Sequence, residues 1–330
     1  MIRITLALAA AALAQLALPC ASHAQRAGPP PRVAVVFSTP PATASMRLAA
    51  LQQRLKELGH IDGQNISLDV RSWAGETRPL ADLAAEVVRS GPAAIVAEGN
   101  PPLAALKHAT ATQPIPIVMA VVADPVGSGF VASLPRPGGN ITGLSNTAEV
   151  LSGKRLEVLK ELVPNLTRAA VLQNPSNRTH PIFMRETQAA AQALGVTLVA
   201  FDLRGEADVD SAFAAMARDR IGAVVAFPQP LIAVLARPLA GATMRYRLPV
   251  VFHSPEAVEA GGLVSYGANS VDLWQRTASY VDRILKGAKP SELPIEQPTR
   301  FDLVLNVKTA RALGLTIPPS MLLRAHQTIE

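Results

Sequence analysis

Val33-Ala34-Val35-Val36-Phe37 is the stretch that decides the fold, because all five residues are apolar and neither face carries a polar side chain. A strand of this kind is typical of the middle of a parallel sheet, where helices cover both sides. Ser38, Thr39 and Pro40 end the run, and residues 46–58 follow with leucines spaced along one helical face. The stretch therefore predicts the first strand and first helix of a layered α/β structure.

The same alternation of apolar strands and helical segments continues along the chain. Further strands are expected at residues 66–73, 93–97 and 115–122, with helices at 79–89 and 103–109. A second series has helices at 151–162, 183–194, 209–217, 231–245 and 271–285, and strands at 168–172, 196–201, 223–227, 250–252, 263–266 and 301–307. Two such series, in a chain of 330 residues, predict two α/β lobes, each a parallel sheet flanked by helices.

The beginning of the chain differs in composition from the rest. A basic residue opens it, residues 4–18 form an apolar run, and Ser22 and Ala24 are small residues at the positions that a signal peptidase reads. Because the run is shorter than the ~20 residues that span a bilayer, it predicts a secretory signal peptide over residues 1–24, cleaved after Ala24, with the periplasm as destination. Cys20, the only cysteine, follows a proline, which disfavours lipidation there and leaves it as an alternative.

Charge and motif content exclude several classes of function. Without the predicted leader, 30 of the 31 basic residues remain against 25 acidic ones, a net charge of +5. The basic residues are scattered and form no stripe of the kind that nucleic acid requires. Dinucleotide, phosphate-loop and nucleophile-elbow motifs are absent, and the six histidines lack metal-ligand spacing. We therefore expect no nucleic-acid binding, no enzyme activity, no cofactor and no metal.

Candidate ligand-binding residues stand where the predicted strands end, because ligands of open α/β sheets bind outside the carboxyl ends of the strands. The candidates are Ser38, Thr39, Asn100, Asp124, Asn174, Phe227 and Tyr266, and later strand ends also carry Asp202, Gln229, His253 and Glu256. Asn100 is a good helix cap before Pro101, which would present free helix N–H groups to a carboxylate, helped by Ser38 and Thr39. Asp124 would pair with an ammonium group. Turn formation and helix capping are the simpler alternatives for these residues.

Several short blocks of sequence carry a family resemblance. They are Leu58-Gly59-His60-Ile61-Asp62-Gly63-Gln64-Asn65, Ala81-Asp82-Leu83-Ala84, Ile115-Pro116-Ile117-Val118, Asp124-Pro125-Val126, Leu134-Pro135-Arg136-Pro137-Gly138-Gly139-Asn140-Ile141-Thr142-Gly143, Lys154-Arg155-Leu156-Glu157, Ala260-Gly261-Gly262-Leu263-Val264-Ser265-Tyr266-Gly267 and Leu313-Gly314-Leu315-Thr316-Ile317-Pro318-Pro319-Ser320. With these blocks, nearly the whole mature chain resembles the TrpX-like ABC transporter substrate-binding proteins.

This resemblance implies a type I periplasmic-binding fold whose lobes are joined by three crossings, near Ser145, Asn269 and Thr299. The N-terminal lobe would comprise residues 25–145 plus 270–298, and the C-terminal lobe residues 146–269 plus 299–330. It further implies a receptor that delivers a small, amino-acid-like ligand to an ABC permease with its ATPase subunits. We expect a monomer. A periplasmic sensing system is the alternative destination of the ligand, because fold alone does not separate sensing from transport.

Overall fold

The computed structural model describes residues 29–73, 79–177 and 179–330. The predicted signal peptide, its cleavage site after Ala24 and Cys20 lie outside the described residues. One compact unit, Pro31–Glu330, carries both of the sheets described below.

The first sheet has five parallel strands in the order β2-β1-β3-β4-β5. Its strands are β1 (Arg32–Phe37), β2 (Ser67–Ser72), β3 (Ala94–Glu98), β4 (Ile117–Val122) and β5 (Ile141–Ser145). The helices between them are α2 (Pro41–Glu57), α3 (Leu80–Arg89) and α4 (Asn100–Ala109). The sequence pattern predicts four of these strands, and β5 is an addition that the structure reveals.

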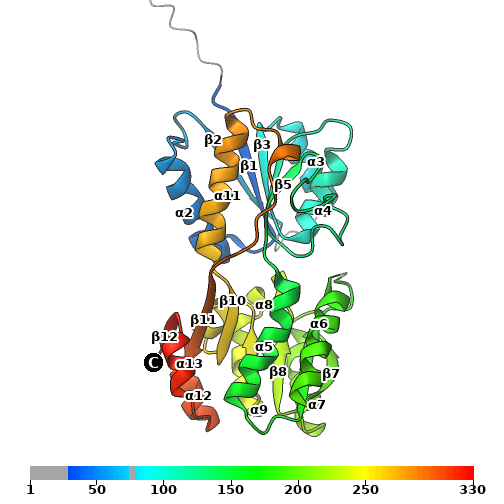
Figure 1. Ribbon diagram of the computed structural model, residues 1–330, viewed down its shortest axis with the longest axis vertical. Helices are drawn as coiled ribbons and strands as arrows, with labels where there is room; N and C mark the ends of the chain where they lie inside the picture. The colour runs from blue at the N-terminus through cyan, green and yellow to red at the C-terminus, as the bar shows by residue number, and fades with distance from the viewer. Residues whose placement is uncertain (1–28, 74–78, 178) are drawn as a thin grey trace, which may run out of the picture. The chain divides into compact units, whose positions relative to one another are not determined.

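Side chains of the first sheet alternate between two apolar clusters, as the period of a strand requires. Val33, Val35 and Phe37 pack with α2 and α11 (Ser270–Leu285), whereas Ala34 and Val36 pack with α3 and α4. Figure 1 shows α11 lying beside α2, although more than two hundred residues separate them in the chain. The all-apolar run at the start of the chain is therefore the buried centre of a helix–sheet–helix sandwich.

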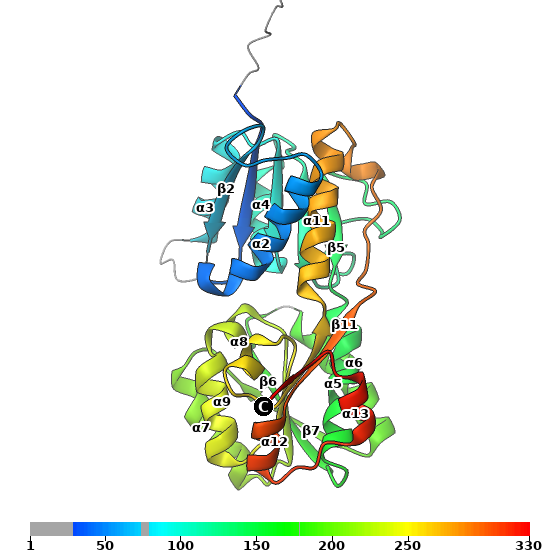
Figure 2. The same ribbon diagram turned by 90° about the vertical axis from the view of Figure 1, so that its left-hand side faces the viewer.

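The second sheet has seven strands in the order β12-β11-β10-β9-β8-β6-β7. Its strands are β6 (Arg168–Gln173), β7 (Thr197–Asp202), β8 (Ala223–Ala226), β9 (Val250–Phe252), β10 (Val264–Ala268), β11 (Phe301–Asn306) and β12 (Gln327–Ile329). Its helices are α5 (Ala148–Leu162), α6 (His180–Leu194), α7 (Ala207–Arg218), α8 (Pro230–Val234), α9 (Ala236–Tyr246), α10 (Glu256–Glu259), α12 (Val307–Leu313) and α13 (Pro319–Arg324). Figure 2 shows α7, α8 and α9 on one side of this sheet and α5, α6 and α13 on the other.

One strand pair departs from the expected parallel arrangement, since β10 and β11 run antiparallel. The connection explains the reversal. After β10 the chain leaves the second sheet, builds α11 against the first sheet, and returns to begin β11 at the end where β10 finished. The two-lobed α/β architecture is confirmed, with this local exception in the second lobe.

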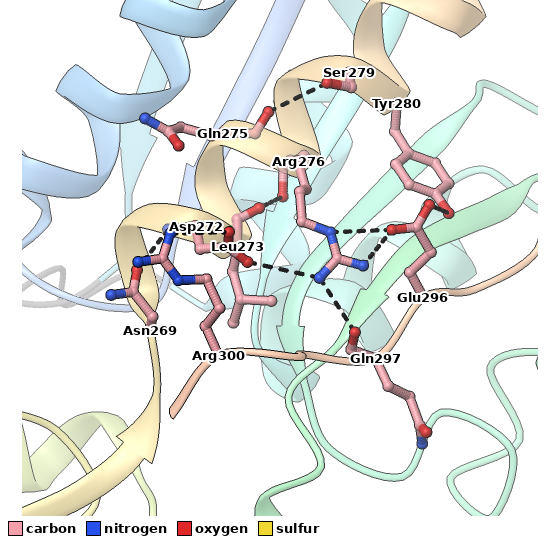
Figure 3. A network of polar contacts seen from close by, with 11 residues as sticks. Asn269, Asp272, Leu273, Gln275, Arg276, Ser279, Tyr280, Glu296, Gln297 and Arg300 are labelled. Atoms are coloured by element: carbon pink, nitrogen blue, oxygen red, sulfur yellow. Dashed lines mark hydrogen bonds and ion pairs between the residues drawn. The ribbon is translucent and has the colours of Figure 1, made fainter. Parts of the chain in front are cut away.

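Arg276 of α11 is the centre of a polar network around the returning segment (Figure 3). Its guanidinium forms an ion pair with Glu296, donates to the backbone oxygen of Gln297 at 3.2 Å and lies 3.6 Å from Asp272. The hydroxyl of Tyr280 donates to the other oxygen of Glu296 at 3.1 Å. The segment before β11 is therefore fastened to α11, and through it to the first lobe.

Candidate functional site

A cavity of about 160 Å³ lies at the carboxyl ends of strands from both sheets. Residues after β1, β3, β4 and β5 form the wall of the first lobe, and residues after β6, β8, β9 and β10, with α5, form the wall of the second. The polar lining residues are Ser38, Thr39, Arg47, Glu98, Asn100, Asn146, Arg155, Asn177, Thr179, Gln229, His253, Ser254, Glu256 and Ser270. Of the seven candidate residues from the sequence, Ser38, Thr39 and Asn100 line this cavity, and so do Gln229, His253 and Glu256, which the sequence also places at strand ends.

Glu98, the last residue of β3, organises the wall of the first lobe. Its side chain is almost fully buried, and Oε2 accepts hydrogen bonds from the backbone N and Oγ of Ser38 at 3.0 Å each and from Oγ1 of Thr39 at 3.1 Å. Oε1 lies 2.8 Å from Nη1 of Arg47 in α2. The carboxylate of Glu98 is thus matched by a cation within the protein, and the hydroxyls of Ser38 and Thr39 are engaged by it.

Asn100 has a structural explanation that differs from the expected carboxylate site. Its side-chain amide donates to the backbone oxygen of Ala123 and accepts from the backbone N of Ala123, both at 2.9 Å, which joins α4 to the end of β4. The next two residues, Pro101 and Pro102, have no N–H to offer an anion. The start of α4 therefore lacks most of the donors that an anion site at a helix N-terminus requires.

Arg155 is the charged residue that distinguishes the second wall. It is 2% exposed, its Nε donates to the backbone oxygen of Tyr266 at 2.8 Å, and its Nη1 contacts Oγ of Ser152 at 3.4 Å. Burial lowers the pKa of Arg155 to about 9, so the guanidinium is still protonated at neutral pH. Among the described residues, Arg155 has no carboxylate partner, which leaves a buried positive charge facing the cavity.

The position of Arg155 follows from the helical period of α5. Ser152, Arg155, Leu156 and Leu159 are all buried on the stripe that packs against β8, β9 and β10. An arginine on the apolar face of a helix is therefore the signal that could have identified this residue from the sequence, since charged residues are seldom fully buried without a partner.

Three further polar groups of the second wall also lack partners among the described residues: Oε2 of Glu256, Nε2 of Gln229 and Nδ1 of His253. Burial, together with the positive charges of Arg155 and Arg47, lowers the pKa of His253 to about 3, so its imidazole is neutral. Buried polar groups are nearly always hydrogen-bonded in folded proteins. Their concentration on one wall indicates that this wall contacts a polar ligand.

The other four sequence candidates do not line the cavity. Oδ1 of Asp124 accepts from the backbone N of Gly127 at 2.8 Å, and Oδ1 of Asn174 accepts from the backbone N of Ser176 at 3.0 Å. Both side chains therefore close the turns that follow their strands. Phe227 is 0% exposed in a core cluster. The ring of Tyr266 stacks on Phe301 at 6.3 Å, while its backbone oxygen holds Arg155.

The cavity is also bordered by strained backbone. Val121 lines it with φ of +56°, where β4 slips in register against β5, and Thr147, just after β5, has φ of +47°. A β-branched residue in this left-handed region is a true outlier. Such strain tends to gather at ligand sites, where the surrounding fold holds it in place.

Comparison with known proteins agrees with this architecture. A family model for ABC transporter substrate binding proteins matches residues 32–329. The chain belongs to this family. The resemblance to TrpX-like proteins seen in the sequence is thereby confirmed, and the chain is a solute-binding receptor for a small ligand.

Three relatives illustrate the family. A conserved domain protein of Vibrio cholerae O1 biovar El Tor is 30% identical, with a TM-score of 0.83 over 91% of this chain and 100% of that chain. An ABC domain of Streptococcus pneumoniae in complex with L-Trp is 27% identical, with the same TM-score and coverage. A tyrosine-binding protein of Clostridioides difficile (strain R20291) is 25% identical over 262 residues, which is 79% of this chain and 74% of the relative.

Family membership also bears on location and chemistry. Substrate-binding proteins of ABC transporters act in the periplasm or elsewhere outside the cytoplasm, and they bind their solutes without being enzymes. Within residues 29–73, 79–177 and 179–330, no helix combines the length and apolarity needed to cross a membrane. The same described residues hold no group of three or more histidine, cysteine or acidic side chains placed to bind a metal ion.

Proposed function

We propose that this chain is the periplasmic receptor of an ABC importer for an amino acid, and that Arg155 holds the carboxylate of the ligand. The receptor would be exported by a signal peptide over residues 1–24, act as a monomer without catalytic activity, and deliver its ligand to a permease and its ATPase subunits. Its lobes would comprise residues 25–145 plus 270–298 and residues 146–269 plus 299–330.

The unpaired charge of Arg155 is the observation that carries the proposal. Burying an ion without a counter-ion costs several kcal/mol, so a fold keeps such a group where a ligand supplies the opposite charge. A guanidinium matches a carboxylate with two parallel hydrogen bonds. Contacts with Tyr266, Ser152 and the backbone oxygen of Ala148 hold Arg155 in place, so its orientation is set before the ligand arrives.

Glu256 supplies the complementary charge for the ammonium group. Its Oε2 is buried and unpartnered among the described residues, it lines the cavity, and no salt bridge there occupies it. Glu98, by contrast, is already paired with Arg47. A cavity with one unpaired cation and one unpaired carboxylate suits a zwitterion, whose carboxylate would pair with Arg155 and whose ammonium group would pair with Glu256. We assign the ammonium contact to Glu256, instead of the Asp124 that strand position alone favours.

Two observations support an amino acid with a sizeable side chain. Leu151, Phe183 and Leu273 give the cavity an apolar part beside its charged groups. Two of the three relatives named above bind tyrosine or L-Trp. A periplasmic sensing system remains the second candidate function, because a ligand-binding cavity serves either a permease or a receptor kinase. Binding to a reconstituted permease, measured with and without ligand, separates the two.

The test is calorimetric titration of residues 25–330, freed of bound solute by unfolding and refolding, against the amino acids. We expect Arg155→Met to weaken binding by about 2–5 kcal/mol, the usual cost of removing one partner of a buried charge pair. Arg71→Met is the matched control, since Arg71 pairs with Asp69 and Glu86 and does not line the cavity. Amides and esters of the ligand should bind poorly to the wild type, and Arg155→Met should bind them no more weakly than the wild type does.

If Arg155→Met binds the amino acid with the affinity of the wild type, and Arg71→Met is folded and binds it too, Arg155 does not contact the ligand. Failure of every amino acid to bind the folded wild type would overturn the ligand assignment and leave the family membership standing. Thermal stability should be followed in parallel, because a ligand at 100 times its Kd raises the free energy of unfolding by about 2.7 kcal/mol.

A further inference from the structure

Gln229 and His253 form a pair of polar groups that the proposed carboxylate and ammonium contacts leave unused. Gln229 follows β8 and His253 follows the neighbouring strand β9, so both residues lie beyond the carboxyl ends of adjacent strands in the second sheet. Gln229 is 6% exposed, and its Nε2 has no hydrogen-bond partner among the described residues; Nδ1 of His253 is buried and unpartnered in the same way. Buried polar groups are nearly always hydrogen-bonded, so two neighbouring unpartnered groups on one cavity wall point to a ligand group that bonds them.

The strand order separates this pair from the carboxylate end of the site. Nε of Arg155 is 2.8 Å from the backbone oxygen of Tyr266 in β10, which places the guanidinium beside β10. His253 then lies one strand further along the sheet and Gln229 two strands further. Two strand spacings amount to roughly 10 Å. A ligand held at Arg155 therefore reaches Gln229 only with a group several bonds away from its carboxylate.

The bonding capacity of the pair defines the chemistry of that group. Nε2 of Gln229 is a donor and requires an acceptor. His253 is neutral and so offers one donating and one accepting nitrogen. A hydroxyl group accepts from Gln229 and also bonds His253, whichever nitrogen carries the proton. A hydrocarbon group satisfies neither residue. An N–H group can donate to His253 or to Oε1 of Gln229, but it leaves Nε2 of Gln229 without an acceptor.

We propose that Gln229 and His253 are specificity-determining residues that select a ligand whose side chain carries a hydroxyl remote from the α-carboxylate. The inference rests on the proposed function, because the amino-acid carboxylate at Arg155 fixes the other end of the ligand. Leu151 and Phe183 line the same cavity and suit the apolar part that joins the two ends.

The probes are L-tyrosine, L-phenylalanine and L-tryptophan, titrated into residues 25–330. We expect tyrosine to bind at least about 10-fold more tightly than either of the others, since each unmade buried hydrogen bond costs about that factor or more. Gln229→Leu should lower the affinity for tyrosine about 10-fold and leave phenylalanine within about 3-fold. It should also raise the Tm of the ligand-free protein, because it removes an unpartnered buried donor.

Gln173→Leu is the matched control, since Gln173 ends β6, donates to Asp202 at 3.3 Å and does not line the cavity. His253→Gln, which keeps a neutral donor and acceptor, should retain part of the preference for tyrosine, whereas His253→Leu should abolish it. These variants separate hydrogen bonding from the shape of the side chain.

Equal affinity of the wild type for tyrosine and phenylalanine would overturn the inference, as would an equal loss of both in Gln229→Leu. If Arg155→Met still weakens amino-acid binding to the extent expected above, the proposed function stands and only the role of Gln229 and His253 fails. If no amino acid binds the folded wild type, the proposed function fails, and the inference fails with it.

Discussion

Replacing Glu98 by glutamine tests how the wall of the first lobe is held together. Glutamine keeps an oxygen for the donors of Ser38 and Thr39 but removes the charge opposite Arg47, whose side chain is only 12% exposed. Breaking a buried ion pair from one side costs about 3–5 kcal/mol. Because Arg47 keeps its bonds to Thr39 at 2.9 Å and to the backbone oxygen of Thr43 at 3.1 Å, we expect the free energy of unfolding of this lobe to fall by about 3 kcal/mol.

The assay is urea unfolding followed by tryptophan fluorescence, which here reports the first lobe selectively. Trp73 and Trp274 are the only two tryptophans of the chain, and both pack in the clusters of the first sheet. Trp274 is 0% exposed and stacks on Phe37 at 4.9 Å, one residue before the Ser38 that bonds Glu98. The double variant Arg47→Met with Glu98→Gln should recover part of the stability, because it leaves no unpaired charge. A loss under about 1 kcal/mol in Glu98→Gln would refute the reasoning.

Three further changes have expected outcomes. Burial lowers the pKa of His180 from 6.5 to about 4, so below pH 6.5 the unfolded chain binds a proton that the folded chain does not. His180 should therefore contribute a loss of up to about 1.4 kcal/mol of stability per pH unit from pH 6.5 towards 4, in addition to the loss from His253, whose pKa is lowered to about 3. His180→Asn should reduce the slope of Tm against pH by the share of His180 and leave the share of His253. Gly267→Ala places a Cβ 2.0 Å from the backbone oxygen of His253 and should cost about 3 kcal/mol, with weaker ligand binding in calorimetry. Asn269→Ala removes the cap that accepts from Asp272 N at 2.7 Å and should lower the free energy of unfolding by about 1–2 kcal/mol in urea titration, against Asn165→Ala at an exposed turn as the comparison.

Much of the fold was predictable because apolar residues set it directly. Strands apolar on both faces and helices with one apolar stripe appear where the sequence places them, within a few residues. The expected helix over 231–245 is instead two helices, α8 and α9, because Pro238 has no N–H to bond the turn before it and its ring clashes there. The strand β5 was not predicted, because a glycine within so short an apolar run favours a turn. In the fold Gly143 adopts φ of +124° and packs against Met119.

The candidate site was less predictable, because strand position fixes where a residue lies and not what it bonds. Asn100 and Asp124 stand at strand ends as expected, yet their side chains bond the backbone at Ala123 and Gly127. Arg155 belongs to a helix and so falls outside a search confined to strand ends. Its role depends on the absence of a partner among the described residues, which is a property of the folded chain that no local pattern contains.

The ion pair of Glu98 with Arg47 has a consequence for the order of events in ligand capture. In the proposed function, the charge of Glu98 is already matched within the first lobe, so among the described residues a charged solute would find its unpaired partners across the cavity, at Arg155 and Glu256. On this proposal we expect the second lobe to make the first contacts with the solute and to orient it, and the first lobe to slow its dissociation. Substitutions on the first wall should chiefly raise the dissociation rate constant of the solute. Loss of Arg155 should raise the dissociation rate constant and also lower the association rate constant.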